Sequence, residues 1–223
     1  MTKDTEQLIR RLAARVEPVR PLARPSVRTG AWLAISLPYV GMMILLLRGQ
    51  HGVAASAQGT HFFVEQIAAL ATGIAAAAAA FASVVPGSDR RLMLLPLLTL
   101  ALWLGSIGQG CLADWIQLGR GGLAVRSDWP CLFAIVIVGA LPAVAIAVML
   151  RRGAPLTPHL TTALGGLAAA GLGDFGLRFF HEETSVMILV WQLGSVFVLS
   201  ALAACAGPLL LKVTLMRASC ENA

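Results

Sequence analysis

Charged side chains are scarce in this chain of 223 residues, since Asp, Glu, Lys and Arg together make up only 13% of it. Soluble domains carry about 25% charged residues, so the low content excludes an ordinary soluble globular protein. Hydrophobic residues make up 57% of the chain, and the mean hydropathy is +0.78. We therefore expect most of the chain to lie within a lipid bilayer.

Motifs for catalysis and for metal binding are also absent. The sequence contains no G-x-S-x-G, no H-E-x-x-H and no phosphate-binding loop. Its four cysteines include no C-x-x-C pair, and its four histidines include no H-x-x-x-H pair. We therefore expect neither an enzyme nor a bound cofactor.

The hydrophobic residues are gathered in six long runs. The runs are 31–47, 62–85, 92–110, 131–150, 159–180 and 186–211. Each can form a transmembrane helix, which needs about 20 mainly apolar residues. The runs do not alternate between apolar and polar residues, so they do not suggest the strands of a β-barrel. We predict an all-α polytopic membrane protein, in which residues 31–211 form a six-transmembrane-helix bundle, followed by a tail at 212–223.

Small residues recur inside these runs at spacings that favour close helix packing. Gly73 precedes an alanine tract at 75–80, and Gly165, Ala169 and Gly173 are each four residues apart. Glycine and alanine allow helix backbones to approach closely within a membrane. We expect the second and fifth spans to pack closely against other helices.

The positions of the basic residues predict the orientation. Six spans place both termini on one side, and 13 of the 17 Lys and Arg residues fall on that side. The four on the opposite side are Arg48, Arg120, Arg126 and Arg178. Because cytoplasmic loops are enriched in Lys and Arg, we predict that both termini are cytoplasmic. The pI of 9.9 then reflects membrane topology, and no direct nucleic-acid binding is expected.

The first 30 residues form a separate segment, in which residues 4–17 have the pattern of an amphipathic helix. The residues on its apolar arc are Leu8, Ile9, Leu12, Ala13 and Val16. Those on its basic side are Arg10, Arg11 and Arg15, with Glu6 spaced to pair with Arg10. Pro18 ends the predicted helix, and a proline-rich linker follows up to residue 30. Three surfaces suit this helix, namely the inner leaflet, the mouth of the bundle and a groove on a soluble partner.

Three charged residues lie inside the predicted spans. Asp174 and Arg178 are spaced to form an ion pair, which would offset most of the free-energy cost of placing either one near lipid. Glu65 lies one turn into the second span, with His61 one turn before it. A structural pair is one interpretation, and a site used by a small-solute or ion transporter or channel subunit is the alternative.

The cysteines allow three interpretations. Cys111 and Cys131 fall on the side opposite the termini and flank 19 residues, so they can form a disulfide or remain inert thiols. A metal site is the third interpretation, because thiolate and imidazole suit zinc; its candidate ligands are Cys131, His181 and His61. Cys205, in the last span, is expected to pack as a small apolar residue.

Several motifs resemble those of one known family. They are Leu8-Ile9, Leu12-Ala13 and Pro18-Val19 in the first segment, WPCL at 129–132, LRRGAP at 150–155 with Pro158 after it, and His181 with Trp191. Together they make the chain similar to the negative regulator of sigma F family (NrsF), which are bacterial inner-membrane anti-sigma factors. The resemblance extends over nearly the whole chain.

This resemblance implies a function. The cytoplasmic N-terminal segment would hold an extracytoplasmic-function sigma factor away from RNA polymerase. The residues implied in the contact are Leu8, Ile9, Arg11, Leu12, Arg15, Val16, Pro18 and Val19. Cysteines facing the periplasm would sense oxidants or heavy metals and trigger release.

The sensing end departs from the family pattern. Members typically carry a second cysteine directly after the histidine of the last periplasmic loop, and here Glu182 follows His181. The candidates for signal sensing are therefore Cys131, Cys111, His181 and Glu182.

Overall fold

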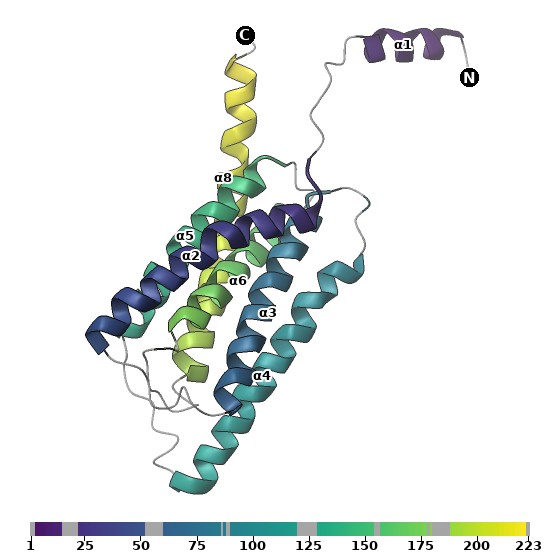
Figure 1. Cartoon of the computed structure of the whole chain (residues 1–223). Helices are drawn as coiled ribbons and strands as arrows, with labels where there is room; N and C mark the ends of the chain where they lie inside the picture. Colours follow the sequence, from purple (N-terminus) through teal and green to yellow (C-terminus); the bar gives the residue numbers. More distant parts are fainter. Residues whose placement is uncertain are drawn as a thin grey trace.

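The computed structural model describes residues 3–14, 22–51, 60–85, 87, 90–119, 129–153, 157–177, 179 and 188–221. Within these residues the regular structure is helical, with no strand. The elements are α1 (Lys3–Ala14), α2 (Pro25–His51), α3 (Thr60–Ala82), α4 (Arg90–Leu118), α5 (Trp129–Arg151), α6 (Pro158–Leu177), a π-helical turn η3 (Ile188–Leu193) and α8 (Gly194–Glu221) (Figure 1).

Six of these helices, α2 to α6 and α8, are long and apolar enough to cross a membrane. Consecutive helices of the bundle run in opposite directions, so that α1 and the last turns of α8 lie toward the same end (Figure 1). We call this the terminal end, where α2 begins, and the opposite end the distal end. The prediction of an all-α fold with six membrane-length helices is confirmed.

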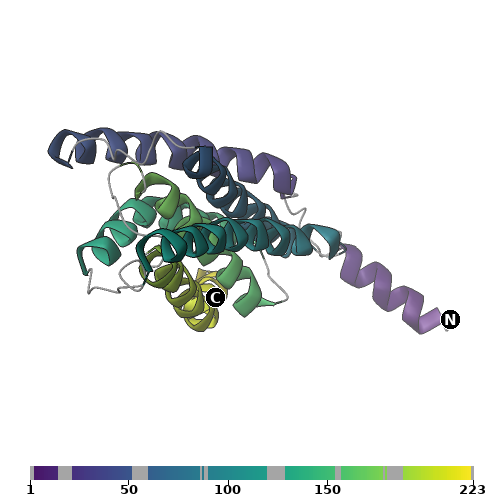
Figure 2. The same ribbon diagram turned by 90° about the horizontal axis from the view of Figure 1, so that it is seen from below.

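Helix α6 is the centre of the bundle. It contacts α2, α3, α5 and α8, and 12 of its 20 residues are buried. Seen from below, α2 and α8 lie on opposite sides of the bundle and α1 projects away from it (Figure 2). Since most residues of α6 face other helices, its sequence must suit several neighbours at once.

Glycines allow α3 and α5 to approach the backbone of α6. A Cβ atom added at Gly171 would lie 3.3 Å from the nitrogen of Gly73 in α3. One added at Gly173 would lie 3.3 Å from the Cα of Gly139 in α5. These separations are shorter than ordinary van der Waals contacts, so a larger residue at either position would displace a neighbour. The predicted close packing of Gly73 and Gly173 is confirmed.

The other two neighbours of α6 come equally close. A Cβ atom at Gly166 would meet the Cα of Ser200 in α8 at 3.0 Å, and one at Gly176 would meet a methyl group of Val40 in α2 at 2.8 Å. Lipid tails are as apolar as the helix surfaces, so packing of this kind has to supply much of the attraction between helices. All four contacts of α6 therefore depend on small residues.

Larger apolar side chains fill the space between these crossings. One cluster contains Trp32, Phe81 and Leu172, and a second contains Trp103 and Leu193. The first joins α2, α3, α5 and α6, whereas the second joins α4 to α3, α6 and the start of α8. Aromatic residues are only 6% of the chain, yet both clusters contain a fully buried tryptophan.

Some helices extend well beyond the apolar runs that predicted them, whereas α3 ends at Ala82, three residues before the end of its predicted run. Helix α2 begins at Pro25, within the predicted linker, because proline at the first helical position gives up no hydrogen bond. Helix α4 continues past residue 110 to Leu118, so Cys111 lies within a helix. Hydropathy marks the lipid-compatible part of a helix and does not register polar turns at either end.

The contact between α3 and α6 gives a prediction about stability. Replacing Gly171 with Leu should lower the free energy of unfolding by about 1–3 kcal/mol, as overpacking does in other cores, because the new side chain must push α3 away. Gly108→Leu on α4 is the matched control, since a Cβ atom there meets nothing within 4 Å. Thermal unfolding of the purified variants in detergent measures the difference, and equal midpoints would contradict it.

Candidate functional site

Helix α1 carries an apolar face that remains exposed. Leu8 is 57% exposed and Ile9 is 50% exposed, on a helix that lies apart from the bundle (Figures 1 and 2). Glu6 and Arg10 lie 3.6 Å apart, which confirms the predicted pairing. A surface pair of this kind contributes only about 0.3–0.5 kcal/mol. Because a helix this short is marginal alone, its apolar face is suited to stabilisation by another surface.

The remainder of the predicted contact segment is described in part. Arg11 is exposed on α1, and Leu12 belongs to the same helix, but its side chain lies outside the description. The predicted contact residues outside the described ranges are Arg15, Val16, Pro18 and Val19. The end of the helix at Pro18 therefore stays a prediction.

Helix α2 is joined to α5 by three hydrogen bonds from side chains to main-chain carbonyls, which we call the α2–α5 ladder. The donor and acceptor residues are Arg28 and Met149, Trp32 and Pro142, and Tyr39 and Ile137. The bonds from Trp32 Nε1 and Tyr39 Oη are 2.9 and 2.8 Å long. The donors are at positions i, i+4 and i+11, so they lie on one face of α2, since 11 residues make about three helical turns.

Arg28 extends the ladder to a third helix. The residue is only 6% exposed, and its guanidinium carbon lies 4.5 Å from the centre of the Phe81 ring in α3. Its Nη2 donates to the carbonyl of Met149 in α5. Cation–π attraction and the hydrogen bond together hold the first turn of α2 against two other helices.

This function of Arg28 was not predicted from the sequence, in which Arg28 is only one of the basic residues of the terminal side. The available signal was the spacing of Arg28, Trp32 and Tyr39, three side chains with hydrogen-bond donors on one face of an otherwise apolar helix. Such donors need partners when buried. That requirement predicts contacts with another element, although it does not identify the acceptor.

Two acidic side chains are buried in the distal half of the bundle. Glu65 in α3 is 2% exposed and Asp174 in α6 is 1% exposed. Gly171, one turn before Asp174, packs against Ala69, one turn after Glu65. The antiparallel course of α3 and α6 therefore places both acidic residues at a similar depth. Arg178 lies outside the described residues, so its ion pair with Asp174 stays a prediction.

The cysteines differ in their surroundings. Cys111 is half-buried in α4 beside the cluster that contains Trp103. Cys131 lies in the first turn of α5, and its side chain is outside the description. Cys205 is exposed on α8, where that stretch of the helix turns this position outward, so the expectation that it packs as a small apolar residue stays a prediction.

The predicted metal ligands are not all described. Among the residues whose side chains are described, no three His, Cys, Asp or Glu side chains lie close enough to hold a metal ion. His61 and Cys131 lie in the first turns of α3 and α5, both at the distal end, with side chains outside the description. His181 and Glu182 are outside the described ranges. The structure thus brings His61 and Cys131 to the same end of the bundle.

A comparison with families of known proteins identifies the chain. The family model named negative regulator of sigma F matches residues 12–212, which is nearly the whole sequence. This chain belongs to the NrsF family. A search of curated proteins and a search of solved structures each found no match. The resemblance drawn from the sequence motifs is confirmed.

The NrsF match covers the six membrane-length helices and both sides of the α2–α5 ladder. It begins at Leu12, within α1, so the exposed Leu8 and Ile9 lie just before it. The family is one of regulators, and its name indicates a sigma factor as the regulated protein. The bundle and the ladder therefore belong to the matched part of the chain.

The ladder gives this NrsF chain a testable contribution to stability. Trp32→Phe removes the bond to the Pro142 carbonyl while keeping an aromatic ring, so unfolding should become easier by about 1 kcal/mol. Trp115→Phe on α4 is the matched control, because Trp115 is 53% exposed. Thermal unfolding in detergent compares the two variants. A Trp32 variant as stable as the control would show that this bond contributes nothing.

Proposed function

We propose that this protein is a membrane-bound anti-sigma factor of the bacterial inner membrane, with both termini in the cytoplasm. Its N-terminal segment holds an extracytoplasmic-function sigma factor and releases it on a periplasmic oxidative or heavy-metal signal. The family name supports regulation of a sigma factor. The observation that carries the proposal is the exposed apolar face of α1, which projects away from the bundle (Figure 2).

The composition of α1 suits binding to a groove on a folded partner. Leu8 and Ile9 are adjacent large apolar side chains, each of which gains about 1.5–3 kcal/mol when fully buried. Arg11 lies beside them and is exposed, so it can meet acidic groups at the rim of the groove. The helix would then be stabilised by its partner, as amphipathic helices are when they dock into grooves.

A route from the sensing end to the binding end is available through α5 and α2. Cys131 lies in the first turn of α5 at the distal end. The ladder joins α5 to α2, and Arg28 holds the turn of α2 that follows the N-terminal segment. A signal that displaces α5 along its axis would therefore act directly on the start of α2.

A second candidate function is the transport of a small solute or ion, which is favoured by the burial of Glu65 and Asp174. Buried ionisable residues within a bilayer often line the pathways of transported ions. Solute flux into liposomes that depends on Glu65 or Asp174 would support this alternative. An anti-sigma factor needs no such flux.

The contact face of α1 can be tested in the full-length protein. Leu8→Asp should reduce recovery of sigma factor at least about tenfold, because it removes one apolar anchor from a groove. The tagged protein is purified from the membranes of its native host, and co-purifying sigma factors are quantified by mass spectrometry. Gln7→Asp is the matched control, since it adds the same charge on the opposite side of α1. Unchanged recovery with the Leu8 variant would remove this face from the proposal.

The proposed sensing thiol has a separate test. Cys131→Ser should keep the sigma factor bound in cells treated with oxidant or with a heavy metal, because serine forms neither a disulfide nor a strong metal bond. Transcription from promoters that depend on the sigma factor measures release. Cys205→Ser is the control, since Cys205 is exposed on α8 away from the distal end. Normal induction in the Cys131 variant would show that another group senses the signal.

A further inference from the structure

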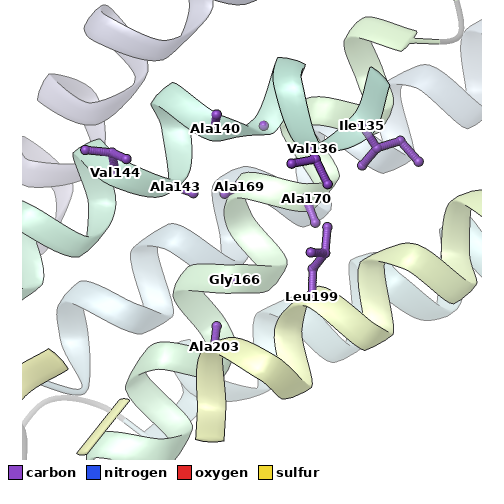
Figure 3. A pocket seen from close by; sticks show the side chains of 11 residues that line it. Ile135, Val136, Ala140, Ala143, Val144, Gly166, Ala169, Ala170, Leu199 and Ala203 are labelled. Carbon is purple, nitrogen blue, oxygen red and sulfur yellow. The ribbon is translucent and has the colours of Figure 1, made fainter. Parts of the chain in front are cut away.

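A groove of about 310 Å³ lies between α5, α6 and α8 (Figure 3). Its walls carry only apolar residues, including Ala143 and Val144 from α5, Gly166 from α6, and Leu199 and Ala203 from α8. Small residues in the walls leave a trough along the outside of the bundle. Water is a poor occupant, because a bound water molecule needs two to four polar partners. The groove therefore suits an apolar ligand.

Two basic side chains lie in line with the groove, toward the terminal end. Arg151 is seven residues after Val144 and so projects from the same face of α5, about 10 Å further along the helix. His159 is seven residues before Gly166, on the same face of α6. Its Nδ1 lies 2.9 Å from the carbonyl oxygen of Ala204, the neighbour of the groove residue Ala203. Both side chains are exposed, one from each of two groove walls.

The surrounding sequence provides only positive charge. Residues 145–165, which include the ends of α5 and α6 next to the groove, contain no Asp or Glu. The stretch 200–219 of α8 contains none either, and it carries Lys212 and Arg217. Among the described residues at this end of α5 and α6, an anionic group would therefore meet the exposed guanidinium of Arg151 and no acidic side chain. The groove and its rim therefore match a molecule with an apolar tail and an anionic head.

We propose that the α5–α6–α8 groove binds one acyl chain of an anionic phospholipid, whose phosphate group is held by Arg151. The inference rests on the proposed membrane location and is independent of sigma-factor binding. The bilayer supplies such lipids at the required depth, with the phosphate near the ends of the helices and the acyl chains beside their apolar turns. A zwitterionic phospholipid offers the same tail but a neutral head, so it binds less tightly.

Native mass spectrometry of the purified full-length protein tests this proposal. The protein in detergent is first mixed with equal amounts of phosphatidylglycerol and phosphatidylcholine. The detergent is then removed in the mass spectrometer. We expect one retained phosphatidylglycerol, and about fivefold lower retention in Arg151→Ala, the factor that one basic residue contributes near a membrane surface. Arg91→Ala is the matched control, because Arg91 is exposed on the first turn of α4. Ala143→Phe should displace the lipid by filling the groove, whereas Ala101→Phe on the exposed side of α4 should not.

Equal retention of the two lipids, or equal loss in the Arg151 and Arg91 variants, would overturn the proposal and leave the membrane location intact. Recovery of the protein in the soluble fraction of lysed cells would overturn both. If Ala143→Phe lowers the midpoint of thermal unfolding, the comparison between Arg151→Ala and Arg91→Ala decides the outcome alone, because both residues are exposed.

Discussion

Helix α6 meets α2, α3, α5 and α8 at glycines where an added Cβ atom would lie only 2.8–3.3 Å from the nearest atom of the neighbouring helix. These crossings set the register of the whole bundle. They place Glu65 and Asp174 at a similar depth and hold α3 and α5 with their first turns at the distal end. The same small residues open the groove between α5, α6 and α8, since a wall of glycine and alanine leaves space on its outer side.

The bundle and α1 differ in how their apolar surfaces are covered. The bundle buries α6 on nearly all sides and turns the outer faces of α4 and α8 outward, where lipid can cover them. Helix α1 packs against no other described helix, and Leu8 and Ile9 stay exposed. The α2–α5 ladder begins where these two parts meet, because Arg28 lies in the first turn of α2. Arg28 therefore attaches the helix that follows α1 to both α3 and α5.

The sequence predicted those features that repeat along the chain. Six apolar runs predicted the six long helices, and the arc through Leu8 and Ile9 predicted α1. The spacing of Gly165, Ala169 and Gly173 predicted the close packing of α6. The ladder could not be predicted, because its acceptors are main-chain carbonyls, which every residue carries. Which helices pack against each other could not be predicted either, because an apolar helix face suits lipid as well as another helix. Cys205 shows this ambiguity, because an alanine-rich stretch does not indicate which side faces outward.

The ladder also places unequal demands on its two helices. Its donors are particular side chains, Arg28, Trp32 and Tyr39, whereas its acceptors are carbonyl oxygens of α5. Residues 137 and 149 can therefore be exchanged for other apolar types over evolutionary time without loss of the bonds, but the three donors of α2 cannot. A homologous chain that shares no side chain with this one along α5 can still hold α2 in the same way.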